Sequence, residues 1–402
     1  MKLQPRAHAK FATLAFAAAL LAACGGGGGD SGGTSTASGT LRLALTDAPA
    51  CGYDQVNVTI ERVRIHTSAT AQDGDAGWSE MVLTPAKRVD LLTLTNGVLE
   101  ELGSTSLPAG RYTQMRLVLG GSMGPGAMAN SLVPSGGSER PMETPSGTQT
   151  GLKMNVDIEV AANQLADFVI DFDACRSVVH AGHSGRYLLK PVLSVMPRVT
   201  TASNAVEGYV AGAVAAGTTS VSLQKEGAVV RATVPGSNGR FLLSQVPAGV
   251  YDLVVRADGR ATAVMTGVPV AGTAITVANP STAPFDPPPS TMRTASGNVV
   301  TSGSAAIPDA TVRALQTAGA TKVELVSRHV DADTGAYSFS LPVAAPVKTA
   351  YVAAATSLTL AEESASAGKY TLEVAVPGKN VQTAGIDLTS EDDTGRTFGF
   401  AP

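Results

Sequence analysis

The chain has 402 residues, a formal net charge of −4 and no long run of basic or acidic side chains. This excludes an electrostatic basis for nucleic-acid binding, which needs clustered Lys and Arg side chains to neutralise phosphates. The length exceeds that of one ordinary domain, so two or three domains are expected.

The N-terminus has the layout of a secretory signal peptide. Lys2, Arg6 and Lys10 precede an apolar run at residues 11–21, and small residues then lead to Cys24. The apolar run is shorter than the roughly 20 residues that span a bilayer. We therefore expect residues 1–23 to be an export signal.

Residues 21–24 (LAAC) resemble the lipobox of bacterial lipoproteins. The resemblance implies cleavage before Cys24, a diacylglycerol thioether on its sulfur and acylation of its new amino group. Several acyl chains on one residue would anchor the protein stably in a membrane. The alternative is a soluble exported protein, cut near Ala23, that keeps Cys24 as a thiol.

Residues 24–39 are predicted to form the lipidated end and a flexible, Gly-rich tether, because they lack apolar side chains to offset the entropy of ordering. Gly25 stands where retention in the inner membrane would call for Asp. The lipoprotein resemblance therefore favours the outer membrane, with the folded part facing the periplasm or the outside.

The chain has three cysteines. Lipidation of Cys24 leaves Cys51 and Cys175 in an oxidising compartment, so we predict a disulfide between these two. A nucleophilic cysteine is the competing interpretation, but no Cys-His-Asn spacing supports it.

Alternation of apolar and polar residues with period two recurs along the chain and predicts a mainly β protein built of several β-sandwiches. In residues 54–65 the alternation changes parity, which predicts either two strands that meet or a bulge near Glu61 and Arg62. Residues 91–102 favour a short helix or turn, and the Gly/Pro-rich residues 120–151 a long mobile or functional loop. The other strands predicted in the first half are at 112–119, 154–160, 168–172 and 188–195.

Six segments in residues 39–198 resemble, in order, the bacterial domain-of-unknown-function family numbered 4382. They are 41–49 (LRLALTDAP), 56–66 (VNVTIERVRIH), 89–97 (VDLLTLTNG), 107–117 (LPAGRYTQMRL), 145–153 (PSGTQTGLK) and 171–191 (DFDACRSVVHAGHSGRYLLKP). The family is known as an exported, often lipid-anchored β domain without an assigned activity. The resemblance thus predicts a β domain at 40–198 and supplies no catalytic residues.

A second module is expected at residues 206–277. Asn238-Gly239 suits a hairpin turn with positive φ, and residues 246–255 (VPAGVYDLVV) a corner before a half-buried strand. The segment is similar to the carboxypeptidase regulatory-like family, which implies a transthyretin-like or carbohydrate-binding-like β-sandwich. Residues 107–112 (LPAGRY) have the same corner pattern.

Residues 296–390 resemble a divergent second copy of that sandwich. Their residues 341–344 (LPVA) lack the glycine of the corner, which leaves strand order and boundaries open. Between the two copies, residues 278–295 contain Pro287-Pro288-Pro289, which predicts a stiff, extended spacer.

His180 and His183 are the candidate zinc ligands. Zinc needs three or four ligands, and residues i and i+3 of a strand face opposite sides, so only a turn at Gly182 would bring the two rings together. Solvent-exposed hairpin histidines are the simpler interpretation.

Asp171, Asp173 and the acidic residues of the segment 331–335 are candidates for catalysis or for calcium binding. Asp171 and Asp173 would lie about 7 Å apart on one strand face, as carboxylates do in inverting glycosidases, but a solvated face already explains them, and a weak calcium contact is a further alternative. Residues 331–335 (DADTG) begin like a calcium loop but lack the later glutamate, so a turn is favoured.

Ser146 and Lys153 do not have the Ser-x-x-Lys spacing of an acyl-transfer site, no phosphate loop occurs, and no cofactor is expected. Aromatic side chains that would serve either the core or a sugar platform are Trp78, Tyr53, Tyr112, Tyr187, Tyr209 and Tyr251.

The sequence therefore predicts a lipid-anchored envelope protein without catalytic activity that acts as a binding, adhesion or structural module. Its expected partners are the membrane, through Cys24, and a glycan or an envelope protein. The alternatives are a carbohydrate-binding lipoprotein and an envelope hydrolase or metalloprotein centred on the first domain.

Overall fold

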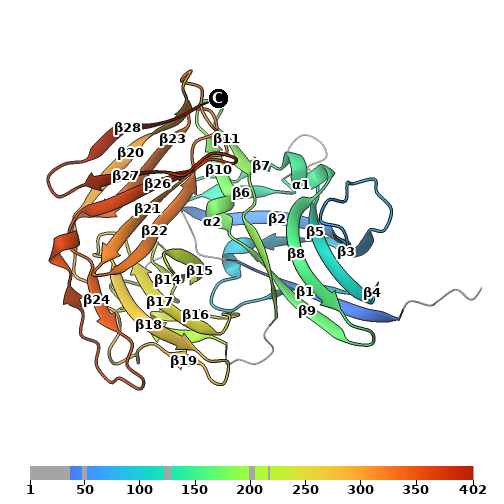
Figure 1. The fold of residues 1–402 in the computed structure, drawn as a ribbon, viewed down its shortest axis with the longest axis horizontal. Helices are drawn as coiled ribbons and strands as arrows, with labels where there is room; N and C mark the ends of the chain where they lie inside the picture. The colour runs from blue at the N-terminus through green and yellow to red at the C-terminus, as the bar shows by residue number, and fades with distance from the viewer. Residues whose placement is uncertain (1–36, 48–51, 122–127, 199–203, 216–217, 402) are drawn as a thin grey trace, which may run out of the picture. The chain divides into compact units, whose positions relative to one another are not determined.

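The first domain contains two β-sheets around an apolar core (Figure 1). The computed structural model describes residues 37–47, 52–121, 128–198, 204–215 and 218–401. One sheet has the order β12(Leu193–Pro197), β9(Leu165–Phe172), β1(Ser38–Asp47), β4(Glu100–Pro108). The other contains β10(Val178–Ala181), β11(Arg186–Leu189), β7(Arg140–Glu143), β6(Ser131–Pro134), β2(Tyr53–His66), β5(Gly110–Leu119) and β8(Leu152–Val160), and β3(Ser79–Asp90) pairs with β2. The helical turns are η1(Leu91–Thr93), α1(Pro145–Gln149) and α2(Ala174–Ser177).

The change of parity in residues 54–65 is a bulge within one strand. β2 shifts register between Ile60 and Arg62 against both of its long neighbours, β3 and β5. Ile60, before the bulge, is buried. Val63 and Ile65, after it, have the opposite parity, but the extra residue turns them inward as well, and they are 2% exposed. The bulge interpretation is confirmed.

The long loop expected at 120–151 is only partly a loop. β6, β7 and α1 lie in it, and Leu132 and Met142 are buried in the core of the first domain. Strands of four residues surrounded by Gly and Pro give almost no alternation to recognise. Their pairing with β2 and with each other reveals them.

The second predicted module is a sandwich of two sheets, here called the middle sandwich. One sheet has the order β16(Arg240–Leu243), β13(Val206–Tyr209), β19(Thr276–Val277). The other has the order β15(Ala228–Thr233), β14(Ser220–Lys225), β17(Gly249–Arg256), β18(Ala263–Val270), β24(Val347–Ala350), β25(Ala361–Glu362).

Both predicted features of the middle sandwich are present. Gly239 has a φ of 78°, and a Cβ on it would lie 2.2 Å from the carbonyl oxygen of Val210. At the corner, the Tyr251 hydroxyl donates to the Pro247 carbonyl at 2.8 Å. The Tyr112 hydroxyl donates to Pro108 in the same way, at 2.9 Å, so the shared pattern makes the same local structure twice.

The last sandwich comprises one sheet of β23(Ala336–Pro342), β20(Met292–Thr301) and β28(Asp393–Phe400), and another of β22(Thr321–His329), β21(Thr311–Ala318), β26(Lys369–Ala375) and β27(Gln382–Asp387). The short helix η2(Ser364–Ser366) precedes β26. β28 lies beyond residue 390, where the predicted module ends. At the corner that lacks glycine, the Pro342 carbonyl accepts a hydrogen bond from Tyr370, which lies far along the chain.

Two segments from outside the predicted module at residues 206–277 pack on the middle sandwich. β24, from within the last module, joins the middle sandwich parallel to β18. Phe285, in the Pro-rich segment, is fully buried in the core of the middle sandwich, and its amide donates to the Tyr209 carbonyl at 2.9 Å. Residues 278–291 thus pack on that sandwich, because the single aromatic side chain among the prolines has an apolar site to fill.

Among the described residues, no helix is long and apolar enough to cross a membrane. The expectation of a multi-domain, mainly β fold is confirmed, with a separate apolar cluster in each of the three parts.

Candidate functional site

The predicted lipidation site, Cys24, and the predicted disulfide partner, Cys51, lie outside the described residues. Cys175 lies in the short helix α2, which Asp173 caps by accepting a hydrogen bond from the Arg176 amide at 2.9 Å. The predicted lipidation and the predicted pairing with Cys51 therefore stay predictions.

The hairpin of β10 and β11 carries His180 and His183 and contacts the predicted turn at residues 331–335. Asp331 accepts a hydrogen bond from the Gly182 amide at 2.7 Å, and the Ala332 amide donates to the His180 carbonyl at 3.0 Å. Asp333 accepts from the Ser184 amide at 3.0 Å. Two motifs about 150 residues apart in the sequence thus form one contact between the first domain and the last sandwich.

The carboxylate of Asp331 is occupied by protein donors. One oxygen accepts from the amides of Asp333 and Thr334 and from the Thr334 hydroxyl, at 2.9–3.1 Å. Burial opposes ionisation, but the hydrogen bonds from Thr334 and Gly182 hold the pKa of Asp331 below its ordinary value. His180 Nδ1 is 3.5 Å from the second oxygen, and its ring packs on Tyr187. The arrangement is that of a turn, as expected.

Among the described residues, no group of three or more His, Cys, Asp or Glu side chains is placed to hold a metal ion. His183 is exposed at the tip of the hairpin.

Asp171 and Asp173 have separate partners. Asp171 forms an ion pair at 3.2 Å with Arg231 of the middle sandwich. Burial raises the pKa of Asp171 to about 6, which the charge of Arg231 opposes. Burial also raises the pKa of Asp173, which caps α2. Each carboxylate therefore has a structural partner of its own.

A second contact between the first domain and the middle sandwich is made by Asn96, which has a φ of 56°. Its amide donates to the Thr233 hydroxyl at 2.9 Å, its side-chain NH₂ donates to the Val234 carbonyl at 2.7 Å, and its side-chain oxygen accepts from the Leu242 amide at 3.1 Å. The dipeptide Asn96-Gly97 was a recognisable turn signal, but its partners lie more than 130 residues away.

The aromatic side chains that were candidates for a sugar platform make contacts with other residues of the protein. Tyr112 and Tyr251 hold the two corners described above. Arg64 and Arg116 stack on the Trp78 ring, 4.5 and 4.7 Å from its centroid. Tyr53 packs edge-on against Tyr187, and the Tyr209 hydroxyl donates to Glu207 at 3.4 Å.

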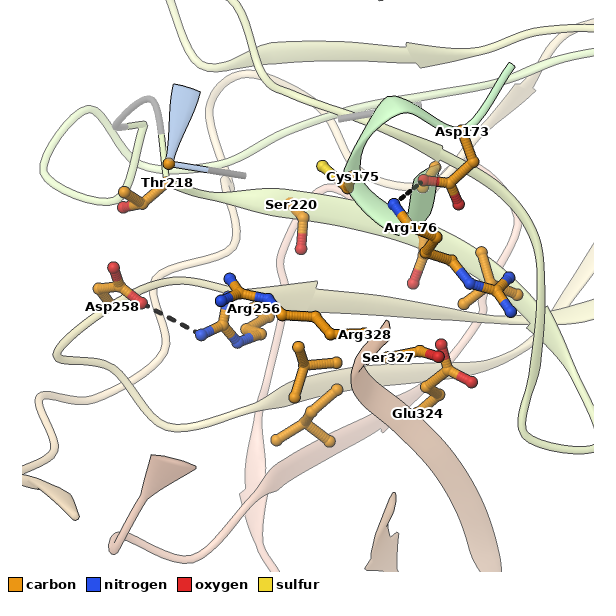
Figure 2. Close-up of a pocket in the computed structure, with 16 residues that line it drawn as sticks. Asp173, Cys175, Arg176, Thr218, Ser220, Arg256, Asp258, Glu324, Ser327 and Arg328 are labelled. Atoms are coloured by element: carbon orange, nitrogen blue, oxygen red, sulfur yellow. Dashed lines mark hydrogen bonds and ion pairs between the residues drawn. The ribbon is translucent and has the colours of Figure 1, made fainter. Parts of the chain in front are cut away.

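A cavity of about 240 Å³ lies where the three parts meet (Figure 2). α2 of the first domain, β14, β15 and β17 of the middle sandwich, and β22 of the last sandwich contribute its walls. We call it the three-domain cavity. A neighbouring cavity of about 210 Å³ shares Cys175 and Arg328 with it and also includes Tyr53, His180 and Asp331.

Charged side chains of both signs line the three-domain cavity. They are Arg176, Arg256 and Arg328, together with Asp173, Asp258 and Glu324. Arg256 is paired with Asp258 at 3.3 Å, whereas Arg176 and Arg328 have no ion-pair partner among the described residues. Glu324 is paired with Arg313, outside the cavity lining, at 3.2 Å. Sequence reasoning missed this cluster because its members are far apart in the chain.

Comparison with known proteins places the first domain in context. Residues 38–191 match the family described as "Domain of unknown function (DUF4382)". The first domain is thus similar to that family, as its motifs predicted. A search of curated proteins gave no match.

Matches among solved structures are distant. The Bacillus anthracis TIE protein is 11% identical over 91% of this chain and 51% of its own, with a TM-score of 0.19, so the chain spans about half of its length. The major pilin subunit of Bacillus cereus is 10% identical over 90% of this chain and 99% of its own, with a TM-score of 0.16. The pilus adhesin SpaC from Lactobacillus rhamnosus GG is 8% identical over 89% of this chain and 38% of its own, also with a TM-score of 0.16. Likenesses this weak carry no inference about function.

Proposed function

We propose that this chain is an exported protein of the outer envelope, anchored to the outer membrane through lipidated Cys24, that acts as a binding, adhesion or structural module without catalysis. The observation that carries the proposal is the joining of the three β parts. Residues 37–402 form one compact unit. Of the acidic candidates, Asp171 pairs with Arg231, Asp173 caps α2, and Asp331 accepts a hydrogen bond from the Gly182 amide. A compact unit is suited to presenting loops to a partner.

The middle and last sandwiches, which resemble the carboxypeptidase regulatory-like family, would act as spacers. They would also fix the position of the first domain through their contacts with it. The corner in which Tyr251 donates to Pro247 supports that resemblance for residues 206–277. The partner that we propose is a glycan or an envelope protein reached from the membrane.

We further propose that Cys175 pairs with Cys51. Gly52, which follows Cys51 directly, lines the three-domain cavity with Cys175, and Tyr53 lines the neighbouring cavity with it. These two neighbours support Cys51 as the partner, so the disulfide would close a large loop of the first domain.

Lipid labelling tests the anchor. In cells grown with radioactive palmitate, the wild-type chain should carry label and sediment with outer membranes, and Cys24→Ser should lose both properties. Cys51→Ser is the matched control: it should keep the label but make Cys175 reactive to a thiol reagent under non-reducing conditions. Label on Cys24→Ser would contradict the anchor, whereas an unreactive Cys175 in Cys51→Ser would contradict only the disulfide.

Protease treatment of intact cells tests presentation. Digestion of the folded part on intact cells would place it outside, and digestion only after outer-membrane permeabilisation would place it in the periplasm. A wild-type chain recovered only in the cytosolic fraction would overturn the proposed function.

A further inference from the structure

The three-domain cavity contains polar atoms that the protein leaves without partners. Nε of Arg176, Nε of Arg256 and the hydroxyl of Ser327 are buried and have no hydrogen-bond partner. Ser327 is only 8% exposed. A buried donor without a partner is destabilising, because its lost hydration is not replaced. The three donors make the wall of the cavity polar and incompletely hydrogen-bonded.

The three acidic side chains of the cavity balance the formal charge of its three arginines, but the guanidinium groups of Arg176 and Arg328 have no ion-pair partner among the described residues. Figure 2 shows the Arg256 and Arg328 side chains beside each other, with Asp258 on the far side of Arg256. Burial lowers the pKa of Arg256, and the positive charge of Arg328 lowers it further, against the effect of Asp258. A second anion would reduce the repulsion between these two neighbouring cations, because Asp258 pairs with Arg256 alone.

The rest of the wall contains the hydroxyls of Thr218, Ser220 and Ser222 and an apolar part. Val229, Leu325 and Val326 line it, so a ligand would need an organic body as well as a charged group. A volume of about 240 Å³ accommodates a small molecule such as a single sugar ring, but no polymer.

We propose that the three-domain cavity binds a small organic anion, with a carboxylate or phosphate group held by the guanidinium groups of Arg256 and Arg328. Arginine binds both groups through paired hydrogen bonds, so the shared feature is a planar or tetrahedral oxyanion. The hydroxyl of Ser327 would donate to the same ligand. Because the walls come from all three parts, an occupied cavity would also hold those parts together. The inference goes beyond the proposed envelope function and does not depend on Cys24.

Three probes with one ring size test the proposal on the purified full chain in detergent. These are glucuronate, glucose 6-phosphate and glucose, each added at millimolar concentration and followed by calorimetry and thermal unfolding. We expect at least one anion to bind and raise the unfolding midpoint, whereas glucose has no effect. Binding of glucuronate alone would identify a carboxylate site, and binding of glucose 6-phosphate alone a phosphate site.

Arg328→Met is the decisive variant, because its side chain is exposed and its loss should leave the fold intact. It should weaken binding of the anion at least tenfold. Arg111→Met removes the same charge from a distant ion pair with Asp157 and should leave binding unchanged. The proposal is overturned if neither anion binds more tightly than glucose, or if the two variants weaken binding equally.

Discussion

The last sandwich contacts its two neighbours in different ways. Against the middle sandwich the contact is buried: the fully buried side chain of Gln224 donates to the Glu324 carbonyl at 2.7 Å and accepts from the Glu324 amide at 2.8 Å. Val254 and Val264 of the middle sandwich also belong to the apolar cluster of the last one. Against the first domain, polar contacts at the surface join His180–Ser184 to Asp331–Asp333 and Lys190 to Asp309, and α2 packs beside β22.

The two kinds of contact should differ in their contribution to stability, because water can replace a lost hydrogen-bond partner only where the group is exposed. Water satisfies exposed groups when their partner leaves, so a surface contact contributes little to stability. Buried groups lose their partner outright, and the full cost of desolvation remains. We therefore expect the two sandwiches to unfold together, while the hairpin of the first domain separates more easily from the last sandwich.

Breaking the buried contact should have the largest effect. Gln224→Ala removes the partner of both backbone groups of Glu324, which should lower the free energy of unfolding by about 3 kcal/mol. Urea unfolding followed by circular dichroism measures it. Gln382→Ala removes an exposed side-chain hydrogen bond to the Gly399 carbonyl and should cost less than about 0.5 kcal/mol. Equal losses in the two variants would remove the distinction between buried and exposed contacts.

The ion pair of Asp171 with Arg231 is a buried ionic contact, and its contribution to stability can be measured as a function of pH. The pKa of Asp171 is raised to about 6, so between about pH 4 and pH 6 the folded state binds more protons than the unfolded state. Stability from this group is present below that window and is lost as the pH rises through it. Relative to Asp171→Asn, the wild type should lose up to about 3 kcal/mol between about pH 4 and pH 7. Identical pH profiles for the two proteins would show that Asp171 does not titrate in this way.

Breaking the surface contact should have the smallest effect. Asp331→Ala removes the acceptor of the Gly182 amide and the hydrogen bonds within its own turn, so we expect a loss of about 1–2 kcal/mol. Hydrogen exchange of the Gly182 amide should become faster, and exchange in β14 should not change. Lys190→Ala breaks a neighbouring exposed ion pair with Asp309 and serves as the control, with a loss below about 0.5 kcal/mol. An unchanged Gly182 amide in Asp331→Ala would show that this contact is not formed.

Local features of the fold could be predicted because they depend on residues close together in the chain. The bulge after Ile60, the positive φ at Gly239 and the corner before Tyr251 all follow from alternation or turn chemistry over a few positions. The four-residue strands β6 and β7 escaped prediction because four residues among Gly and Pro carry too little pattern.

The candidate site was less accessible to prediction. Cys175 and His180 were singled out in the sequence, but Arg256 and Arg328, which carry the proposed ligand site, were not. An arginine in an alternating strand has no local feature that distinguishes a cavity lining from a solvated face. Only the packing of the last sandwich against the middle sandwich brings the two side chains to one cavity.

The sequence by itself determined the mainly β fold, the turns and corners, and the similarity of the first domain to its family, since each depends on short-range pattern. Tertiary structure decided which distant segments meet: β24 in the sheet of the middle sandwich, Asp331 at Gly182, and Tyr370 at the corner that lacks glycine. The physical reason is that backbone conformation is set by neighbours in the chain, whereas an edge strand, a carboxylate or a hydroxyl can be satisfied by any partner that the packing places within reach.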